Sequence, residues 1–221
     1  ILMLPDPPAV AAVLAAITPA PRPGLLVVDM GTTAVLETRR FAEVAATAGT
    51  AWMDAPVSGG AVAAQSASLT IMAGGSDDAF ARAVPLFQAM GRRTTHVGGV
   101  GAGQVAKAAN QVIVGLTIGA VAEALALARA AGVDPARVRD AIRGGFAESR
   151  ILELHGQRMV SGDFTPGGRV VTQAKDMRQA LELAAAVGVE LPATALSRAL
   201  YERLIDQGDG GLDHAALYRI Y

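Results

Sequence analysis

The pattern of apolar residues changes abruptly near residue 103, and this change constrains the fold more than any other feature of the sequence. Before it, short apolar runs typical of strands alternate with longer runs typical of helices. After it, every convincing run is helical, beginning with a long stretch over 104–131. Alternating strands and helices are typical of an α/β sheet that is mostly parallel. We therefore expect an α/β domain at 1–103 and an all-helical domain at 104–221, joined by the long helix.

Glycine, proline and aspartate mark several ends of the expected elements. Gly132 is suited to end the long helix, and Asp134 with Pro135 is suited to begin the next one. Strands are expected at the end of 1–4 and at 25–29, 51–54, 69–73 and 94–97. Helices are expected at 7–17, 33–48 and 77–90 in the first domain, and at about 170–187 and 193–206 in the second.

Composition excludes several classes of function. Nineteen basic residues against 20 acidic ones leave a net charge of -1, so no basic excess is available for a nucleic-acid backbone. Cysteine is absent, which excludes disulfides, thiolate metal sites and a cysteine nucleophile. The three histidines, at 96, 155 and 214, are too scattered to indicate a metal-ligand motif. We expect that the protein binds neither nucleic acid nor a metal.

The most apolar segment, 112–128, is long enough to be considered as a membrane span. Glu123 lies inside it, and Lys107, Asn110 and Gln111 precede it, so a buried helix is the favoured interpretation. No charged segment followed by an apolar core opens the chain, so no secretion signal is expected. The sequence predicts a cytoplasmic protein without membrane contact.

Two residue types are rare enough to be informative. Of the 19 basic residues, only Lys107 and Lys175 are lysine, and the rest are arginine. Arginine stays protonated in proteins, whereas a lysine amine can release and recover a proton. The only asparagine, Asn110, follows Lys107 by three residues on one face of the expected helix. Because the positive end of that helix favours a neutral amine, we predict that Lys107 is a general acid/base, with Asn110 holding a hydroxyl or the amine.

The glycines before this helix allow a second interpretation. Residues 101–106 match the G-x-G-x-x-A form of a dinucleotide fingerprint, with Glu123 about 20 residues further on. That fingerprint requires a strand after the helix, and none is expected. We therefore interpret Gly101 and Gly103 as a tight start to the long helix.

Three other segments have both a functional and a structural interpretation. Ser58-Gly59-Gly60 follows a strand, and it either presents N–H groups and a hydroxyl to a carboxylate or forms an ordinary turn. Asp29 with Thr32 and Thr33 follows another strand, where α/β sheets bind ligands, but these residues are equally suited to cap the next helix. Lys175-Asp176 is either functional or an exposed charged pair.

Taken together, these motifs resemble the β-hydroxyacid dehydrogenase family. The matching motifs, in family order, are Asp54-Ala55-Pro56-Val57-Ser58-Gly59-Gly60, Gly101-x-Gly103-x-x-x-Lys107-x-x-Asn110 and Lys175-Asp176. Each motif alone is modest, whereas the combination is specific, and the resemblance covers essentially the whole sequence. Segments 109–114 and 141–145 look closest to the tartronate-semialdehyde (2-hydroxy-3-oxopropionate) reductase branch, which accompanies the 3-hydroxyisobutyrate dehydrogenases in this 6-phosphogluconate dehydrogenase-like family.

The resemblance implies a Rossmann-type first domain and an NAD- or NADP-dependent oxidoreductase that acts on a small 3-hydroxy acid. It implies that Lys107 exchanges the proton with the substrate oxygen. It also implies that Asn110 and the Ser58-Gly59-Gly60 turn hold the small carboxylate substrate. It further implies that the nicotinamide is bordered by Leu4, Pro5 and Thr32, and that Lys175 closes over the cofactor.

The sequence departs from the family pattern in three places. Family members begin with a strand and a G-x-G-x-x-G loop, whereas this chain starts at a later strand, so the first domain is expected to lack about 60 residues, or two βα units. Gly168-Arg169 stands where the family usually carries Gly-Phe. The run Asp29-Met30-Gly31-Thr32 replaces the usual Asp-x-Ser-Thr.

Two interpretations of function stay open. The first is the oxidoreductase, whose choice between NAD and NADP depends on a residue that would precede this chain. The second is a non-catalytic fragment that acts as a helical dimerisation module. In either case the long apolar helix, with Ala122, Ala126 and Ala130 at i,i+4 spacing, predicts a homodimer or homotetramer formed through the helical domain.

Overall fold

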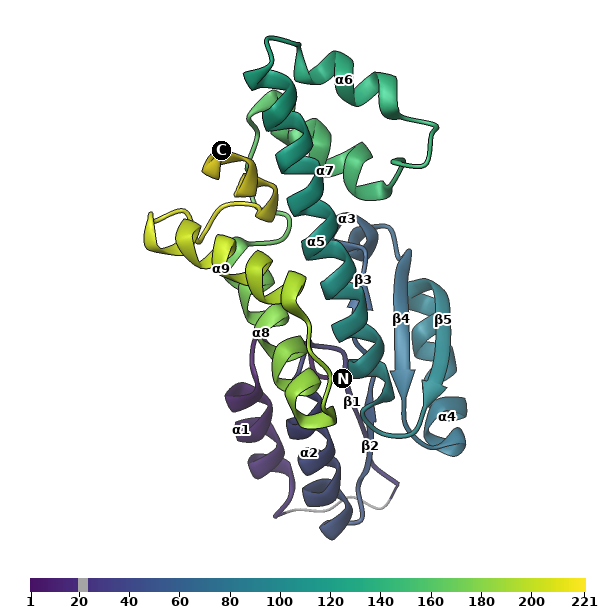
Figure 1. Cartoon of the computed structure of the whole chain (residues 1–221). Coiled ribbons are helices and arrows are strands. Elements are labelled where there is room, and N and C mark those ends of the chain that lie inside the picture. The colour runs from purple at the N-terminus through teal and green to yellow at the C-terminus, as the bar shows by residue number, and fades with distance from the viewer. Residues whose placement is uncertain (20–23) are drawn as a thin grey trace. The chain divides into compact units, whose positions relative to one another are not determined.

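The computed structural model describes residues 1–19 and 24–221, which form two compact units at Ile1–Ala109 and Asn110–Tyr221 (Figure 1). The boundary falls inside the long helix α5 (Ala102–Ala130), so the first turns of this helix belong to the first unit and the remainder to the second.

The described part of the first unit contains one five-stranded sheet. Its strands are β1 (Leu26–Asp29), β2 (Ala51–Asp54), β3 (Val57–Ser58), β4 (Leu69–Gly74) and β5 (Gly91–Gly98). β1 pairs with β2 and β4 pairs with β5 in parallel, whereas β4 runs antiparallel to both β2 and β3. Leu2 adds a parallel bridge to Asp29 at the end of β1, which confirms the strand end expected near the start of the chain.

The sheet is therefore mixed: most of its paired residues are parallel, as expected, but the antiparallel pairing of β4 with β2 and β3 was not expected. The reason lies in the connection between β3 and β4. A parallel crossover needs about a dozen residues or more, usually with a helix. Here the connection contains only the six-residue helix α3 (Gly60–Gln65), so the chain turns back and β4 pairs antiparallel with β3. Neither α3 nor the two-residue β3 was predicted from the sequence.

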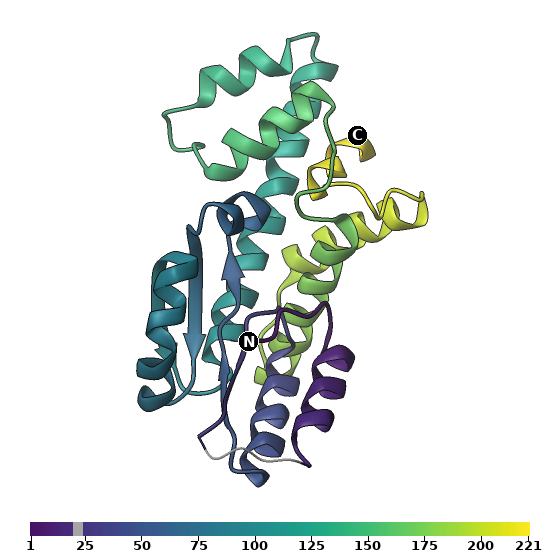
Figure 2. The ribbon, with the colours of Figure 1, turned by 180° about the vertical axis from the view of Figure 1, so that it is seen from behind.

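Helices cover both faces of this sheet (Figures 1 and 2). The helices of the first unit, besides α3 and the start of α5, are α1 (Pro7–Ile17), α2 (Val35–Thr47) and α4 (Asp77–Met90). Successive residues of β1 point to opposite faces, so Val27 joins a core with α1 and α2, while Val28 joins a core with α4. Trp52 and Met53 of β2 divide in the same way. The helices expected at 7–17, 33–48 and 77–90 are confirmed.

The second unit is helical, as expected. Besides α5 it contains α6 (Pro135–Ile142), α7 (Arg150–Ser161), α8 (Val170–Val187), α9 (Pro192–Asp206) and a 3-10 helix, η1 (His214–Ile220). Asp134 caps α6 through the Ala136 N–H, and Gly188 ends α8 in the left-handed conformation. Sequence analysis expected α8 and α9 nearly at their observed bounds but did not identify α7 or η1.

Helix α5 is long and apolar enough to cross a membrane if only its length and composition are considered. Its inward face, however, forms the centre of the helical unit, where Ile118, Ala122 and Leu125 are fully buried. These residues pack with buried side chains of α8, α9 and η1, including Met177, Tyr201 and Leu217. This packing supports the interpretation of α5 as a core helix.

The start of α5 lies tightly against the sheet because Gly103 has no side chain. A Cβ at this position would lie 2.4 Å from the Met72 carbonyl oxygen and 2.7 Å from that of Asp54. Both are backbone atoms of sheet strands, which cannot move aside as a flexible side chain can. The glycine therefore fixes how closely α5 approaches β2 and β4.

We expect Gly103→Ala to lower the free energy of unfolding by about 1–3 kcal/mol, as overpacking against backbone usually does. Gly99→Ala is the matched control, because a Cβ there would meet no atom within 4 Å. Denaturant unfolding of both variants measures the difference. Equal stability of the two variants would show that the close approach at Gly103 carries no energetic weight.

Candidate active site

The first turn of α5 is capped by a carboxylate that lies 47 to 50 residues earlier in the sequence. Asp54, at the end of β2, is fully buried, and its two oxygens accept hydrogen bonds from Gly101 N at 2.6 Å and Gln104 N at 2.8 Å. Burial raises the pKa of Asp54 above its ordinary value, the two backbone hydrogen bonds oppose that rise, and nearby Asp29 adds to it. Asp54 therefore fixes the start of α5 on the sheet.

This arrangement explains the glycines of the G-x-G-x-x-A match. In a dinucleotide fingerprint, free N–H groups at the helix start bind the pyrophosphate. Here the Gly101 and Gln104 N–H groups already donate to Asp54. The structure thus supports the interpretation of this motif as a tight helix start.

Gln104 ties the same helix to the loop that follows β1. Its side chain is buried, with Nε2 donating to Gly31 O at 2.9 Å and Oε1 accepting from Thr33 N at 3.2 Å. Within the loop, the buried Asp29 carboxylate accepts from Gly31 N and from Thr33 Oγ1. The loop containing Thr32 is thereby held against the first turn of α5. Sequence analysis did not identify Gln104, because no sequence signal distinguishes it from any other glutamine.

Lys107 lies beside the Ser58-Gly59-Gly60 turn, so the structure brings these predicted site residues together. The Lys107 side chain is 8% exposed, and its Nζ donates to Val57 O at 2.8 Å. Gly59 and Gly60 have positive φ angles of 127° and 64°, which L side chains rarely adopt. A buried amine thus lies next to an exposed turn with backbone N–H groups, an arrangement suited to proton transfer near a bound carboxylate.

Asn110 lies one helical turn after Lys107 on α5 and belongs to a network of amides in the second unit. Its Nδ2 donates to Gln111 Oε1 at 2.9 Å. Gln111 Nε2 in turn donates to Asp176 Oδ2 at 2.6 Å and to Gln173 Oε1 at 3.2 Å. Lys175 Nζ lies 3.2 Å from the other oxygen of Asp176. Asp176 is buried, so Lys175-Asp176 is no exposed charged pair, and the structural alternative considered from the sequence is wrong.

Leu4, Pro5 and Thr32 lie at one edge of the sheet in the first unit. Leu2 N donates to Val28 O and Met30 N donates to Leu2 O, so the first residues of the chain run parallel to β1. Just beyond, Gly31 approaches Leu4 so closely that a Cβ would lie 2.8 Å from the Leu4 carbonyl oxygen. The carboxyl ends of parallel strands are where α/β sheets bind ligands. These predicted residues are therefore at a suitable edge.

Two of the three histidines meet in the helical unit, although their sequence positions are distant. His155 of α7 and His214 of η1 both lie close to Asp213, and their rings meet edge to face with centroids 4.6 Å apart. Their sequence spacing indicated no metal-ligand motif, and the fold nevertheless brings these two histidines together beside Asp213. Asp213 accepts from three N–H groups, which belong to Gly167, Gly168 and Ala215.

The surroundings of Asp213 favour an internal ionised carboxylate over a metal ligand. Burial opposes its ionisation, but the hydrogen bonds from His155 and from the three backbone N–H groups outweigh burial and hold the pKa of Asp213 well below its usual range. Arg158 Nη1 lies 3.6 Å from Asp213 Oδ2. This positive charge and the occupied carboxylate oxygens disfavour a divalent cation.

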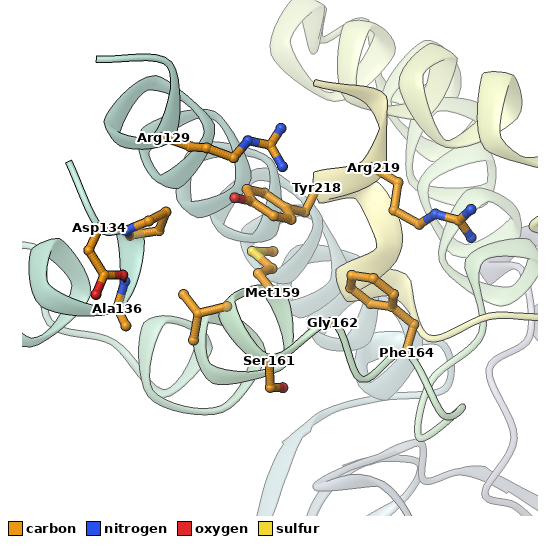
Figure 3. A pocket seen from close by; sticks show the side chains of 11 residues that line it. Arg129, Asp134, Ala136, Met159, Ser161, Gly162, Phe164, Tyr218 and Arg219 are labelled. Carbon is orange, nitrogen blue, oxygen red and sulfur yellow. The ribbon is translucent and has the colours of Figure 1, made fainter. Parts of the chain in front are cut away.

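A separate cavity of about 510 Å³ opens in the helical unit, among the ends of α5 and α7, the start of α6 and η1 (Figure 3). Arg129 lies over the Tyr218 ring at 4.9 Å, and Met159 and Phe164 form part of the apolar lining. None of the predicted site residues lines this cavity. It is therefore distinct from the polar groups around Lys107 and Asn110.

Comparison with known proteins identifies the family. Residues 1–99 match the NAD binding domain of 6-phosphogluconate dehydrogenase, and residues 101–221 match the NAD-binding domain of NADP-dependent 3-hydroxyisobutyrate dehydrogenase. The chain is 46% identical to 2-hydroxy-3-oxopropionate reductase of Escherichia coli K12 over 98% of this chain and 75% of the relative. It is 36% identical to 3-hydroxyisobutyrate dehydrogenase of Pseudomonas aeruginosa, over 89% of this chain and 69% of the relative.

A solved structure agrees with these matches. The 3-hydroxyisobutyrate dehydrogenase of Salmonella typhimurium superimposes with a TM-score of 0.91 and 29% identity, covering 99% of this chain and 78% of that one. The chain belongs to the 3-hydroxyisobutyrate dehydrogenase family. Its members include NAD(P)-dependent oxidoreductases, so the resemblance noted from the motifs is confirmed, and the helical dimerisation module gains no support.

The described residues fit the nicotinamide end of the family's cofactor, NAD or NADP. At the sheet edge, Met3 and Pro5 are exposed and give an apolar surface for a flat ring, next to the loop that contains Thr32. Asp29 is fully buried and accepts hydrogen bonds from Gly31 N and Thr33 Oγ1 of that loop. The resemblance predicts that Leu4, Pro5 and Thr32 border this ring.

We expect Asp54→Asn to lower the free energy of unfolding by about 1–3 kcal/mol. The NH₂ group of the asparagine would face one of the two backbone N–H groups that donate to Asp54, and that donor would lose its acceptor. The folded-state pKa of Asp54 lies above its ordinary value of 3.8. The carboxyl group of Asp54 therefore holds its proton more tightly in the folded protein than in the unfolded chain. As the pH rises from the ordinary pKa through the raised one, the free energy of unfolding of the wild type decreases. The variant lacks this dependence.

The stability difference between wild type and Asp54→Asn should therefore narrow from acidic to neutral pH. Thermal unfolding across that pH range measures it. Asp78→Asn serves as the control, because this carboxylate of α4 is 81% exposed and its loss should change little. A difference that widens with pH would contradict a raised pKa at Asp54.

Proposed function

We propose that this protein reduces 2-hydroxy-3-oxopropionate to 2,3-dihydroxypropanoate with NADH or NADPH, and catalyses the reverse oxidation. The observation that carries the proposal is the buried Lys107 amine, held 2.8 Å from Val57 O beside the Ser58-Gly59-Gly60 turn. The choice of substrate is supported by the higher identity to the Escherichia coli reductase than to the Pseudomonas dehydrogenase. The substrate class is a small hydroxy acid with a carboxylate.

Each proposed residue has a separate task in this reaction. The nicotinamide, when bound, supplies the hydride that reaches the aldehyde carbon. Lys107 gives a proton from its ammonium group to the aldehyde oxygen, which becomes a hydroxyl, and takes that proton back in the oxidation. The N–H groups and hydroxyl of Ser58-Gly59-Gly60 bind the carboxylate.

Asn110 and Lys175 complete the proposed machinery. Asn110, one turn beyond Lys107 on α5, holds the hydroxyl of the substrate, because i,i+3 side chains of a helix share a face. Lys175, held by Asp176 at 3.2 Å, contacts the cofactor and transfers no proton. The two lysines therefore differ in role although both are amines.

A substrate panel tests the proposal. The native protein is assayed by nicotinamide absorbance with both cofactors, in separate reactions with 2-hydroxy-3-oxopropionate, 3-hydroxyisobutyrate and L-serine. We expect the highest kcat/KM for 2-hydroxy-3-oxopropionate. A clear preference for 3-hydroxyisobutyrate would assign the protein to the other named activity of its family, and turnover of none of them would contradict the proposal.

The same substitution at the two lysines separates their roles. Lys107→Arg keeps the charge but removes the exchangeable proton at neutral pH, so kcat should fall by about 10²–10⁴ with a smaller change in substrate KM. Lys175→Arg is the matched variant, and it should act through the cofactor KM while kcat and its pH profile stay close to wild type. Steady-state kinetics across pH measures both.

Either of two results would contradict these assignments. Near-normal kcat in Lys107→Arg would exclude this amine as the proton donor. If the ionisation seen in the pH profile of kcat disappeared in Lys175→Arg, the acid/base role would belong to Lys175.

The proposal includes a cytoplasmic homodimer or homotetramer assembled through the helical unit. Ala122 is buried inside its own protomer and is not available to a partner helix, so the alanine argument from the sequence needs correction. The exposed apolar side chains of α5 support the assembly instead, since Ile113 is 66% and Leu127 is 71% exposed. The cytoplasmic location rests on the similarity to bacterial relatives such as the Escherichia coli reductase.

Light scattering at micromolar concentration should give a mass of at least two chains. Leu127→Glu should shift the protein toward the monomer, because a charge would replace apolar surface at the proposed interface. Leu86→Glu is the control, since this exposed leucine lies on α4 in the other unit. A monomeric wild type would contradict the assembly.

A further inference from the structure

A buried glutamine connects α8 to α5 through two complementary hydrogen bonds. Gln173 is 1% exposed, its Nε2 donates to Gln111 O at 3.1 Å, and its Oε1 accepts from Gln111 Nε2 at 3.2 Å. Gly115 on α5 makes this approach possible, because a Cβ there would lie 2.7 Å from Gln173 Nε2. The Gln173 carboxamide therefore fixes both the backbone and the side chain of Gln111.

The same Gln173 oxygen also lies near the histidine cluster of the helical unit. His214 Nδ1 lies 3.4 Å from Gln173 Oε1. The neighbouring Asp213 holds this segment by accepting hydrogen bonds from Ala215 N and from the two glycine N–H groups before α8. Gln173 is thus located between a segment fixed by a buried carboxylate and the polar side chains of α5.

The bonds of Gln111 determine the orientation of Asn110. Both hydrogens of Gln111 Nε2 are used, one toward Gln173 Oε1 and one toward Asp176 Oδ2 at 2.6 Å. Gln111 Oε1 is then the atom that faces Asn110, and it accepts from Asn110 Nδ2 at 2.9 Å. Because the NH₂ group of Asn110 is held by Gln111, the Asn110 Oδ1 atom points away from Gln111 and can accept a hydrogen bond from a hydroxyl.

We propose that Gln173 is a positioning residue, which orients the Asn110 amide through Gln111 so that Oδ1 accepts from the substrate hydroxyl. The inference rests on the proposed function. This role needs a side chain that both donates and accepts a hydrogen bond, because Gln173 contacts the carbonyl oxygen and the side-chain NH₂ group of Gln111. An apolar side chain of similar size would fill the space and leave the Gln111 amide free to rotate.

The test compares Gln173→Met, Asn110→Ala and the double variant in the native protein. Gln173→Met should lower kcat/KM for the hydroxy acid by about tenfold or more, because a misdirected substrate contact is costly for the rate. The cofactor KM should stay near its wild-type value. Adding Gln173→Met to Asn110→Ala should cause little further loss, since residues that act through one another are not additive.

Gln179→Met is the matched control, because it makes the same change two turns later on α8, where Gln179 Oε1 has no hydrogen-bond partner in the described residues. It should leave kcat/KM unchanged. Gln173→Asn is a second variant for the case that Gln173→Met folds poorly, because it keeps a carboxamide but moves it away from Gln111. It should show the same loss and the same non-additivity.

Calorimetry without cofactor gives a readout that does not depend on turnover. Binding of 2,3-dihydroxypropanoate should weaken in Gln173→Met and in Asn110→Ala, and should not weaken in Gln179→Met. Additive losses in the double variant, or full activity and binding in both Gln173 variants, would overturn the positioning role while leaving the proposed function intact. An inactive wild type that binds no hydroxy acid would overturn the proposed function and this inference with it.

Discussion

The hydrogen bonds from Gly101 and Gln104 to the buried Asp54 carboxylate are the interaction on which the arrangement of the first unit depends. They attach α5 to the end of β2, and Gly103 allows the helix to come close enough for them to form. Once the first turn is fixed, the Gln104 side chain reaches the loop after β1, and Lys107, one turn later, reaches Val57 O. The position of the amine is therefore set by the backbone of the sheet.

Two buried carboxylates have similar structural tasks but opposite shifts in pKa. Asp54 and Asp213 both bind backbone N–H groups of segments distant in sequence. Asp54 has two such bonds and another carboxylate nearby, so burial dominates and its pKa is raised. Asp213 accepts from two such distant N–H groups and from the nearby Ala215 N–H, and it has His155 and Arg158 close by, so its pKa is lowered. The direction of each pKa shift therefore depends on the polar and charged side chains around the carboxylate as well as on its burial.

The sequence was sufficient to predict residues whose chemical type is rare, and insufficient for residues whose importance depends on contacts. Lys107 and Asn110 could be recognised because the chain has only two lysines and one asparagine. Gln104, Gln111 and Gln173 are common in type, and their partners lie up to 73 residues away in sequence, so no local pattern identified them. Long helices with clear ends, such as α1 and α4, were predicted well. The short β3 and α3 give too few residues for a periodic pattern, and missing them left the antiparallel pairing of β4 unforeseen.

The scarcity of lysine gives the protein an unusual chemical property. Every lysine amine in the sequence belongs to the proposed machinery, and both are largely shielded, with Lys107 8% exposed and the Lys175 side chain 19% exposed. A reagent that acylates lysine amines therefore has no competing side-chain targets on the outer surface, where arginine supplies the positive charge. The extent of acylation at each of the two positions reports how open its surroundings are, which makes unmodified protein suitable for footprinting without engineered labels.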